Sequence, residues 1–152
     1  MNLATWNIRG LNKTLKHKVV KNLVSNQKLG ILVLVETRVK QFNADKVLSS
    51  LGLHWEVLYN YHCHGNGRVW IMWDPNTCYI TLSQSIEQGI HCHVLIKPLN
   101  QHFDMTAVYA HNSGQKRCAL WKWLCDLKNT ITNPWVVMGD FCLLYTSPSP
   151  RD

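Results

Sequence analysis

The spacing of apolar residues over the first fifty positions predicts two strand–helix pairs. Residues 3–7 predict a short strand, and from Thr14, a predicted N-cap, apolar residues recur at helical spacing to about Lys28. Gly30 is expected to end that helix. The continuous apolar run 31–35 predicts a buried strand that finishes on Glu36, and residues 43–51 predict a second helix stopped by Gly52.

The pattern then changes to a series of short strands, predicted over 55–59, 69–73, 79–83, 92–96 and 105–109. The separators 65–67, 74–76 and 98–101 are rich in Gly, Pro, Asn and Asp, so these strands are expected to pair as antiparallel hairpins. A third helix is predicted over 115–129 and a last strand over 135–138. The order predicts a sheet-based α/β or α+β fold whose helices cover an apolar face.

Length and hydrophobicity favour one globular domain. The chain has 152 residues, 46% of them hydrophobic, with seven Trp, which is enough for one core and too little for two domains. Its longest apolar run, around 30–35, is far short of the ~20 residues of a membrane helix, and Met1 leads directly into a strand pattern. We therefore expect an intracellular protein without a signal peptide, a transmembrane segment or membrane association.

The six cysteines form no Cys-x-x-Cys pair, which favours reduced, half-buried thiols over disulfides. Two triplets, His62-Cys63-His64 and His91-Cys92-His93, contain possible zinc ligands. In a strand, each would present two His on one face and Cys on the other. The pattern favours strand residues without a metal, with zinc as the alternative.

Positive charge is concentrated in the first third of the chain. Residues 1–52 hold nine Lys or Arg and two acidic residues, so they carry the whole net charge of +7. A one-sided basic region suits a polyanion such as nucleic acid, because each neutralised phosphate releases counterions. A solvated basic helix face is the alternative.

Several polar residues stand where predicted strands end: Asn7, Glu36, Tyr109, Asn112 and Asp140. A rigid sheet can direct such groups into one crevice. Carboxylate and amide oxygens suit Mg²⁺, while an acid, a phenol and an amide can orient water and bind phosphate oxygens. Metal-assisted phosphodiester hydrolysis is the chemistry that uses these groups together.

Five ordered motifs carry a resemblance to a known family: Trp6-Asn7-Ile8-Arg9-Gly10-Leu11-Asn12, Val35-Glu36-Thr37-Arg38, Gly67-Arg68-Val69-Trp70-Ile71-Met72-Trp73-Asp74, Val108-Tyr109-Ala110-His111-Asn112 and Val137-Met138-Gly139-Asp140-Phe141. They resemble the endonuclease/exonuclease/phosphatase superfamily, most closely the endonuclease domain of plant LINE-type (non-LTR) retrotransposons. The resemblance implies a four-layer sandwich of two mixed β-sheets with outer helices, present here only as its N-terminal part.

The same resemblance assigns roles to seven residues. It implies Mg²⁺ (or Mn²⁺) binding by Asn7 and Glu36, phosphate contacts by Tyr109 and Asn112, activation of water or of the leaving group by Asp140, and DNA contacts by Arg9 and Arg68. The expected activity is nicking of target DNA to prime reverse transcription. A nuclear location and a reverse transcriptase domain downstream are further expectations.

Two positions depart from the family pattern, and the end of the chain is unlike the family. His111 stands where relatives often have proline, and Cys142 stands where the motif continues with asparagine. Residues 142–152 resemble a translated sequencing adaptor, a disordered Ser/Pro-rich terminus being the alternative. We therefore expect a partial domain over 1–141 followed by a non-native tail, with the family's late Asp and terminal Asp-His pair absent.

Other functions remain open from the sequence. One is an inactive remnant that binds nucleic acid through its basic first third. Another is a different member of the superfamily, either an abasic-site repair nuclease or a phosphatase. An unfinished sandwich is also expected to expose sheet edges and to be poorly soluble.

Overall fold

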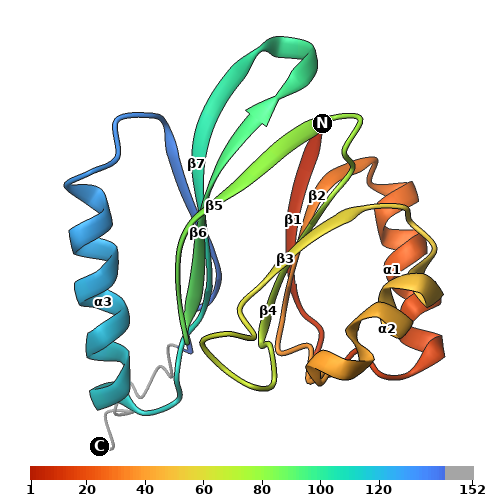
Figure 1. Ribbon diagram of the computed structural model, residues 1–152, viewed down its shortest axis with the longest axis horizontal. Helices are drawn as coiled ribbons and strands as arrows, with labels where there is room; N and C mark the ends of the chain where they lie inside the picture. Colours follow the sequence, from red (N-terminus) through yellow and green to blue (C-terminus); the bar gives the residue numbers. More distant parts are fainter. Residues whose placement is uncertain (143–152) are drawn as a thin grey trace, which may run out of the picture.

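Two four-stranded sheets form the centre of the protein. The structure, a computed structural model, describes residues 1–142 (Figure 1). The first sheet has the order β1 (Asn2–Asn7), β2 (Leu29–Val35), β4 (Val69–Trp73) and β3 (Glu56–Tyr59). β1 and β2 are parallel, while β4 is antiparallel to both of its neighbours, so this sheet is mixed.

The second sheet has the order β5 (Cys78–Ile86), β6 (Gly89–Ile96), β7 (Gln101–Tyr109) and β8 (Trp135–Asp140). β5, β6 and β7 are antiparallel, and β8 is parallel to β7, so this sheet is mixed as well.

Helices cover the outer face of each sheet (Figure 1). α1 (Thr14–Asn26) and α2 (Ala44–Leu51) lie beside the first sheet, with a 3₁₀ turn at Gln41–Asn43 leading into α2. α3 (Gly114–Lys128) lies against the second sheet, and a second 3₁₀ turn, Lys97–Leu99, precedes β7. The four layers confirm the predicted fold class.

The continuous apolar run of β2 follows from its place between two cores. Every residue of β2 is buried. Ile31 and Val33 pack in the core between the sheets, whereas Leu32 and Leu34 pack in the core that the first sheet forms with α1 and α2. A strand covered on both faces has no solvent side, so it shows no polar alternation.

Two predictions near α1 are wrong in detail. Lys13, not Thr14, is the N-cap residue, and it makes no side-chain cap hydrogen bond. The helix ends at Asn26, and Gly30 lies inside β2. Lys28, with a left-handed φ of 48°, forms the turn between the helix and β2. The strand therefore begins at Leu29, before the glycine that was expected to end the helix.

The predicted hairpins are correct within each sheet and wrong between β4 and β5. β3 pairs with β4, and β5, β6 and β7 pair in series. The turn at 74–76 instead carries the chain from the first sheet to the second. β5, β6 and β7 are longer than predicted, because part of each carries polar residues on an exposed or hydrogen-bonded side.

The predicted tail over 142–152 lies outside the described residues except for Cys142. All six cysteines are unpaired. Among residues 1–142, no helix has both the length and the apolar character needed to cross a membrane.

Candidate active site

A cleft opens where strands of both sheets end. Because β1 is parallel to β2 and β7 is parallel to β8, their carboxyl ends bring polar residues to the same end of the sandwich (Figure 1). A volume of about 640 Å³ there is lined by Asn7, Arg9, Glu36, Arg38, Tyr109, Asn112, Asp140 and Cys142. Six of the seven predicted site residues therefore line one cleft. Arg68, the seventh, lines an adjoining space of about 590 Å³ together with Glu36, Tyr109 and Asn112.

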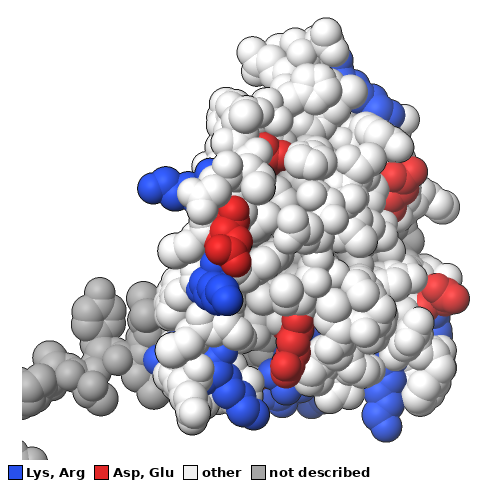
Figure 2. Space-filling model, turned by 60° about the vertical axis from the view of Figure 1, so that its left-hand side comes forward, with Lys and Arg blue, Asp and Glu red and all other residues white. Residues whose placement is uncertain are grey.

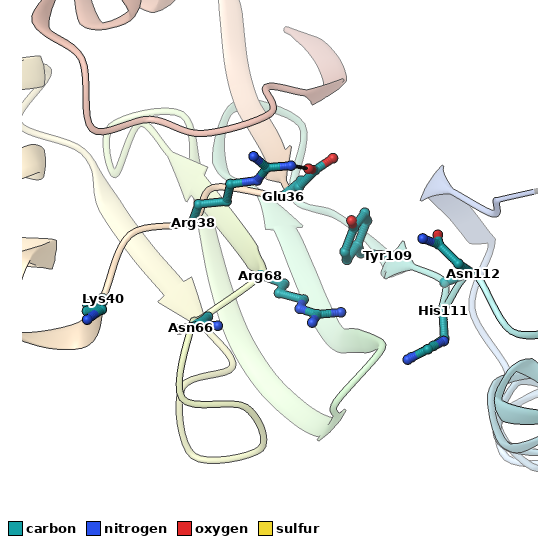
Figure 3. Close-up of a pocket in the computed structure, with 9 residues that line it drawn as sticks. Glu36, Arg38, Lys40, Asn66, Arg68, Tyr109, His111 and Asn112 are labelled. Carbon is teal, nitrogen blue, oxygen red and sulfur yellow. Dashed lines mark hydrogen bonds and ion pairs between the residues drawn. The ribbon is translucent and has the colours of Figure 1, made fainter.

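Glu36 follows the last residue of β2 and is held at the sheet rim. Its backbone N–H donates to the Arg68 carbonyl at 2.8 Å, and its φ of 57° is left-handed. One carboxylate oxygen pairs with the Arg38 guanidinium (Figure 3). The Glu36 side chain is 15% exposed and that of Arg38 is 65% exposed, so the arginine can leave the carboxylate without disturbing the core.

A direct hydrogen bond joins the two sheets inside the cleft. The Asn7 amide nitrogen donates to Asp140 Oδ2 at 2.6 Å, and Asn7 Oδ1 accepts from the Arg9 backbone N–H at 3.2 Å. Burial acts to raise the pKa of Asp140, but hydrogen bonds from the Cys142 N–H and from Asn7 outweigh it, so the pKa lies below its ordinary value. Asp140 is therefore an anion at neutral pH.

Tyr109 ends β7 beside two oppositely charged groups. Burial, followed by the negative charge of Glu36, raises the pKa of the Tyr109 phenol. The Arg68 guanidinium carbon lies 5.7 Å from the centre of the Tyr109 ring, in cation–π range. Tyr109 is therefore a neutral phenol at physiological pH, able to donate a hydrogen bond.

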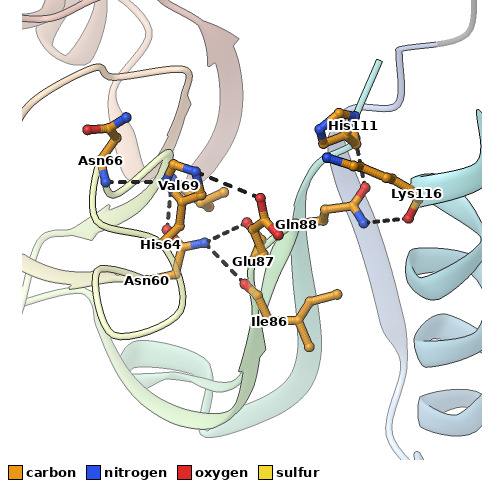
Figure 4. Close-up of polar contacts among 9 residues, drawn as sticks. All are labelled: Asn60, His64, Asn66, Val69, Ile86, Glu87, Gln88, His111 and Lys116. Atoms are coloured by element: carbon orange, nitrogen blue, oxygen red, sulfur yellow. Dashed lines mark hydrogen bonds and ion pairs between the residues drawn. The ribbon is translucent and has the colours of Figure 1, made fainter. Parts of the chain in front are cut away.

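The loop after β7 places Asn112 at the cleft. The Arg117 guanidinium donates to the carbonyl oxygens of His111 and Asn112, at 3.0 and 2.8 Å. The His111 backbone N–H donates to Gln88 Oε1 at 2.7 Å, and Gln88 Nε2 donates to the Lys116 carbonyl (Figure 4). Proline has no backbone N–H, so a proline at position 111 could not make the hydrogen bond to Gln88 that holds this loop.

Asn60 supports the same end of the molecule and was not identified from the sequence. Its side chain is fully buried, accepts from the Val69 N–H at 3.2 Å, and donates to the carbonyls of Ile86 and Glu87 at 3.1 Å each (Figure 4). It thus ties the loop before β4 to the turn between β5 and β6.

Gly67 and Thr37 fix the approach to Arg68 and Glu36, and neither role was identified from the sequence. Gly67 has a φ of 46°, and a Cβ there would lie 2.0 Å from the Tyr61 ring. Buried Thr37 donates from Oγ1 to the Gly67 carbonyl at 2.8 Å. The sequence offered a clue to both residues, because both lie inside motifs that carried the family resemblance.

Unusual backbone conformations gather around the cleft. Arg9, Glu36, Arg38 and Cys142, all non-glycine, have φ between 48° and 57°. Such conformations cost about 1–3 kcal/mol each in sterically unfavourable cases and persist where surrounding contacts impose them. Clustering of this kind is typical of sites that position side chains for a ligand.

The rim of the cleft is basic. Arg9, Arg38, Lys40 and Arg68 line the two adjoining spaces, around the carboxylates of Glu36 and Asp140. On the face drawn in Figure 2, Lys and Arg gather toward the lower edge, the end at which β1, β2, β7 and β8 finish. An anionic ligand would meet complementary charge before reaching the two carboxylates.

The donor atoms in the cleft suit a hard cation. Asn7, Glu36 and Asp140 offer amide and carboxylate oxygens from both sheets. Mg²⁺ prefers oxygen, retains several waters and commonly takes one or two protein carboxylates. The donor set fits Mg²⁺ or Mn²⁺.

Cys142 does not reproduce the asparagine that the family motif has there. Its thiol contacts the Ala110 carbonyl at 3.1 Å, and burial and then the charge of Asp140 raise its pKa. A neutral thiol cannot donate and accept as an amide does.

The structure separates the two His-Cys-His triplets. His62-Cys63-His64 lies in a turn, so its predicted strand geometry is wrong. His91-Cys92-His93 lies in β6 with the predicted faces: Cys92 in the core between the sheets, and both histidines on the opposite face. Burial lowers the pKa of His91. This triplet lies outside the strand-end cleft.

Comparison with known proteins identifies the same architecture. Residues 4–141 match the protein family described as the Endonuclease/Exonuclease/phosphatase family. No curated protein matches the sequence.

Solved structures share the fold at low identity. They include an endonuclease/exonuclease/phosphatase family protein (TM-score 0.67, 12% identity) and a mannosyl-6-phosphatase (0.70, 13%), both from Bacteroides thetaiotaomicron, and TDP2 from Caenorhabditis elegans (0.69, 19%). The matches cover 92, 96 and 93% of this chain but 62, 67 and 47% of those chains. The chain thus spans about half to two thirds of their length.

Proposed function

Because the chain belongs to the endonuclease/exonuclease/phosphatase family, we propose that the strand-end cleft is the metal-binding part of an active site that hydrolyses phosphodiester bonds. One observation carries the proposal: oxygen donors from both sheets meet in a cleft with a basic rim. Members of this family are generally hydrolases, and neither a nucleophilic Ser nor a redox group is needed for such chemistry.

Each cleft residue has a role in this proposal. Asn7 and Glu36 hold Mg²⁺ or Mn²⁺, with Arg38 leaving Glu36 when the site is loaded. The bound cation supplies charge neutralisation and polarisation of a phosphate oxygen. Asp140, ionised at neutral pH, accepts a proton from water or orients it. The Tyr109 phenol and the Asn112 amide donate to phosphate oxygens.

We further propose that the substrate is DNA, nicked by the endonuclease domain of a LINE-type retroelement to prime reverse transcription. The basic rim and the concentration of charge in residues 1–52 support a nucleic-acid substrate. Arg9 and Arg68 would contact its backbone. The motif around Arg9 and that around Arg68 support the retroelement branch, for which a downstream reverse transcriptase and nuclear action are expected.

A second candidate is nucleic-acid binding without cleavage. Cys142 replaces an amide of the family motif, and the chain spans only part of the solved structures it resembles. Both observations favour a loss of catalysis, and the basic rim then supports binding of DNA without cleavage. The remaining alternative within the family is an abasic-site nuclease, or a phosphatase such as the mannosyl-6-phosphatase of similar fold.

The test is plasmid nicking in Mg²⁺ by this chain and by an extended protein, defined as residues 1–141 continued into the native downstream reading frame. We expect supercoiled plasmid to be converted to open circles by the extended protein. Glu36→Gln should lower that rate about 100-fold or more, because it removes a charged ligand of the cation.

Glu56→Gln is the matched control, because Glu56 is an exposed glutamate of β3 outside the cleft. Equal nicking by the Glu36 variant and the Glu56 variant would overturn the assignment. Hydrolysis of a phosphorylated sugar or of abasic DNA in preference to intact plasmid would instead favour the other family members.

A further inference from the structure

A second polar cluster lies on the outer face of the second sheet, in the middle of its strands. Alternation along β6 places His91 and His93 on that face, while Ile90, Cys92 and Val94 face the core between the sheets. The β6–β7 register sets His93 opposite Asp104 and His91 opposite Thr106. Two imidazoles and one carboxylate therefore meet by strand pairing.

The charge of Asp104 is poorly compensated. Its side chain is only 2% exposed, and His93 is its single ion-pair partner within residues 1–142. The other oxygen of Asp104 accepts from the Asn133 amide at 3.3 Å. A buried carboxylate is costly unless it is paired with a cation or coordinates a metal.

We propose that His91, His93 and Asp104 form a second metal site, separate from the strand-end cleft, that binds Zn²⁺. One ligand atom from each residue lies within 4.8 Å of the other two. Ligands of a tetrahedral zinc ion at about 2.0–2.1 Å lie roughly 3.3 Å apart. His93 and Asp104, which are already in direct contact, must therefore move apart to admit the ion, and no pair must approach by more than roughly 1.5 Å.

His93 can supply that movement. Its side chain is 53% exposed, so rotation of its ring disturbs no core contact. Because this side of the cluster faces solvent, a water molecule can take the fourth coordination position of a tetrahedral ion. His91 and Asp104, both buried, are the fixed part of the site.

A second set of hydrogen bonds orients the fixed ligands. His91 Nδ1 contacts Thr106 Oγ1 at 2.9 Å, which leaves Nε2 as the remaining ring nitrogen. The Trp135 indole N–H donates to the same Thr106 oxygen at 2.9 Å. Such partners fix the ring orientation of metal-binding histidines, and their removal typically lowers affinity about 10- to 100-fold.

The ligand chemistry selects zinc over the cation of the cleft. Imidazole nitrogen with one carboxylate suits Zn²⁺, whereas Mg²⁺ prefers oxygen alone. A bound ion would connect β6 and β7, and through Asn133 and Trp135 the beginning of β8. Binding would therefore stabilise the second sheet, independently of any activity at the cleft.

The experiment is calorimetric titration of the metal-free full chain with ZnCl₂, in a Cys118→Ser, Cys125→Ser background that removes the two exposed thiols. We expect one saturable site. His93→Gln, at the exposed ligand, and Asp104→Asn should each weaken binding at least about 10-fold. His54→Gln, an exposed histidine in the loop before β3, should leave it unchanged.

Nuclear magnetic resonance of the histidine ring nitrogens provides a readout that needs no substitution. Zn²⁺ should shift the ring signals of His91 and His93 and leave those of His54 in place. Absence of saturable binding by the folded chain, or full affinity in His93→Gln, would overturn the proposal. Loss of binding in Glu36→Gln with retention in His93→Gln would also overturn it, because the ion would then lie in the cleft.

Discussion

The cleft at the strand ends and the cluster on the outer face of the second sheet are built in opposite ways. The ends of strands and the loops that follow them position the cleft residues, and four non-glycine residues there have left-handed φ. Strand register brings His91, His93 and Asp104 together in the middle of β6 and β7, outside the cleft. The cleft is open and has a basic rim, whereas the outer-face cluster is buried apart from His93.

This difference indicates what each region can bind. Strand ends and the adjoining loops leave oxygen donors and arginines facing a space of about 640 Å³, which suits a hard cation together with a large anion from solvent. Cross-strand pairing brings two imidazoles and a carboxylate within 4.8 Å of one another, which suits a single ion. The two regions should therefore respond independently to substitution.

The largest expected effect is on the nicking rate, which should depend on the cleft and not on the outer-face cluster. In the extended protein, Asp140→Asn should lower the nicking rate about 10²- to 10⁴-fold, because it removes a group that accepts a proton. His93→Gln should retain the full rate in Mg²⁺. Similar losses in both variants, measured on supercoiled plasmid, would show that the two regions are not functionally separate.

The next effect is on stability and concerns the path of β8 beside the cleft. Gly139 has a φ of 139°, and a Cβ there would lie 1.9 Å from the Val108 carbonyl oxygen. Gly139→Ala should lower the free energy of unfolding by about 3 kcal/mol or more, since both strain and overlap are introduced. Urea unfolding measures it.

Gly65→Ala is the control for that substitution, because no atom lies within 4 Å of a Cβ at Gly65. We expect little change there. A cost at Gly139 no larger than at Gly65 would mean that β7 and β8 move apart easily and that their close approach at Gly139 is not required for stability.

A smaller effect is expected on DNA affinity. Arg68→Gln should weaken binding of this chain to duplex DNA and reduce the slope of log affinity against log salt by about 1, the change for one phosphate contact. Lys122→Gln, on an exposed position of α3 outside residues 1–52, is the charge-matched control. Fluorescence anisotropy at several salt concentrations measures the slope for each variant. Equal slopes for the two variants would mean that Arg68 does not contact the DNA.

The smallest effect is on the pH dependence of stability. The pKa of Asp140 is lowered in the folded protein, so the carboxylate contributes stability above its ordinary pKa of 3.8. That contribution is lost as pH falls through the folded value. The stability advantage of the native protein over Asp140→Asn should therefore disappear in acid, and an advantage that grows on acidification would contradict the lowered pKa.

The apolar strands were the part of the fold that could be predicted most closely. β4 has the predicted bounds, and the buried run of β2 was found apart from its first two residues, because strands covered on both faces have no polar alternation to confuse the pattern. The strands predicted at β6 and β7 were too short, because His91 and Asp104 interrupt the apolar pattern. Their side chains find their partners on the neighbouring strand, which the local sequence does not show.

The candidate site was predicted where motif and strand end coincide. Glu36 directly follows the apolar strand β2 and Asp140 is the last residue of β8, and the structure brings them to one cleft. Asn60 and Gln88 were missed, because most of their side-chain partners lie more than twenty residues away in the sequence. Their burial and hydrogen bonds depend on how the two sheets pack, which local pattern does not encode.

The central claim is that Glu36 belongs to an oxygen-ligand cation site in the cleft, and Mn²⁺ binding by this chain, measured by electron paramagnetic resonance, tests it most directly. We predict one saturable Mn²⁺ site, weakened at least about 10-fold by Glu36→Gln and unchanged by Glu56→Gln and His93→Gln. Unchanged Mn²⁺ affinity in Glu36→Gln would contradict the claim.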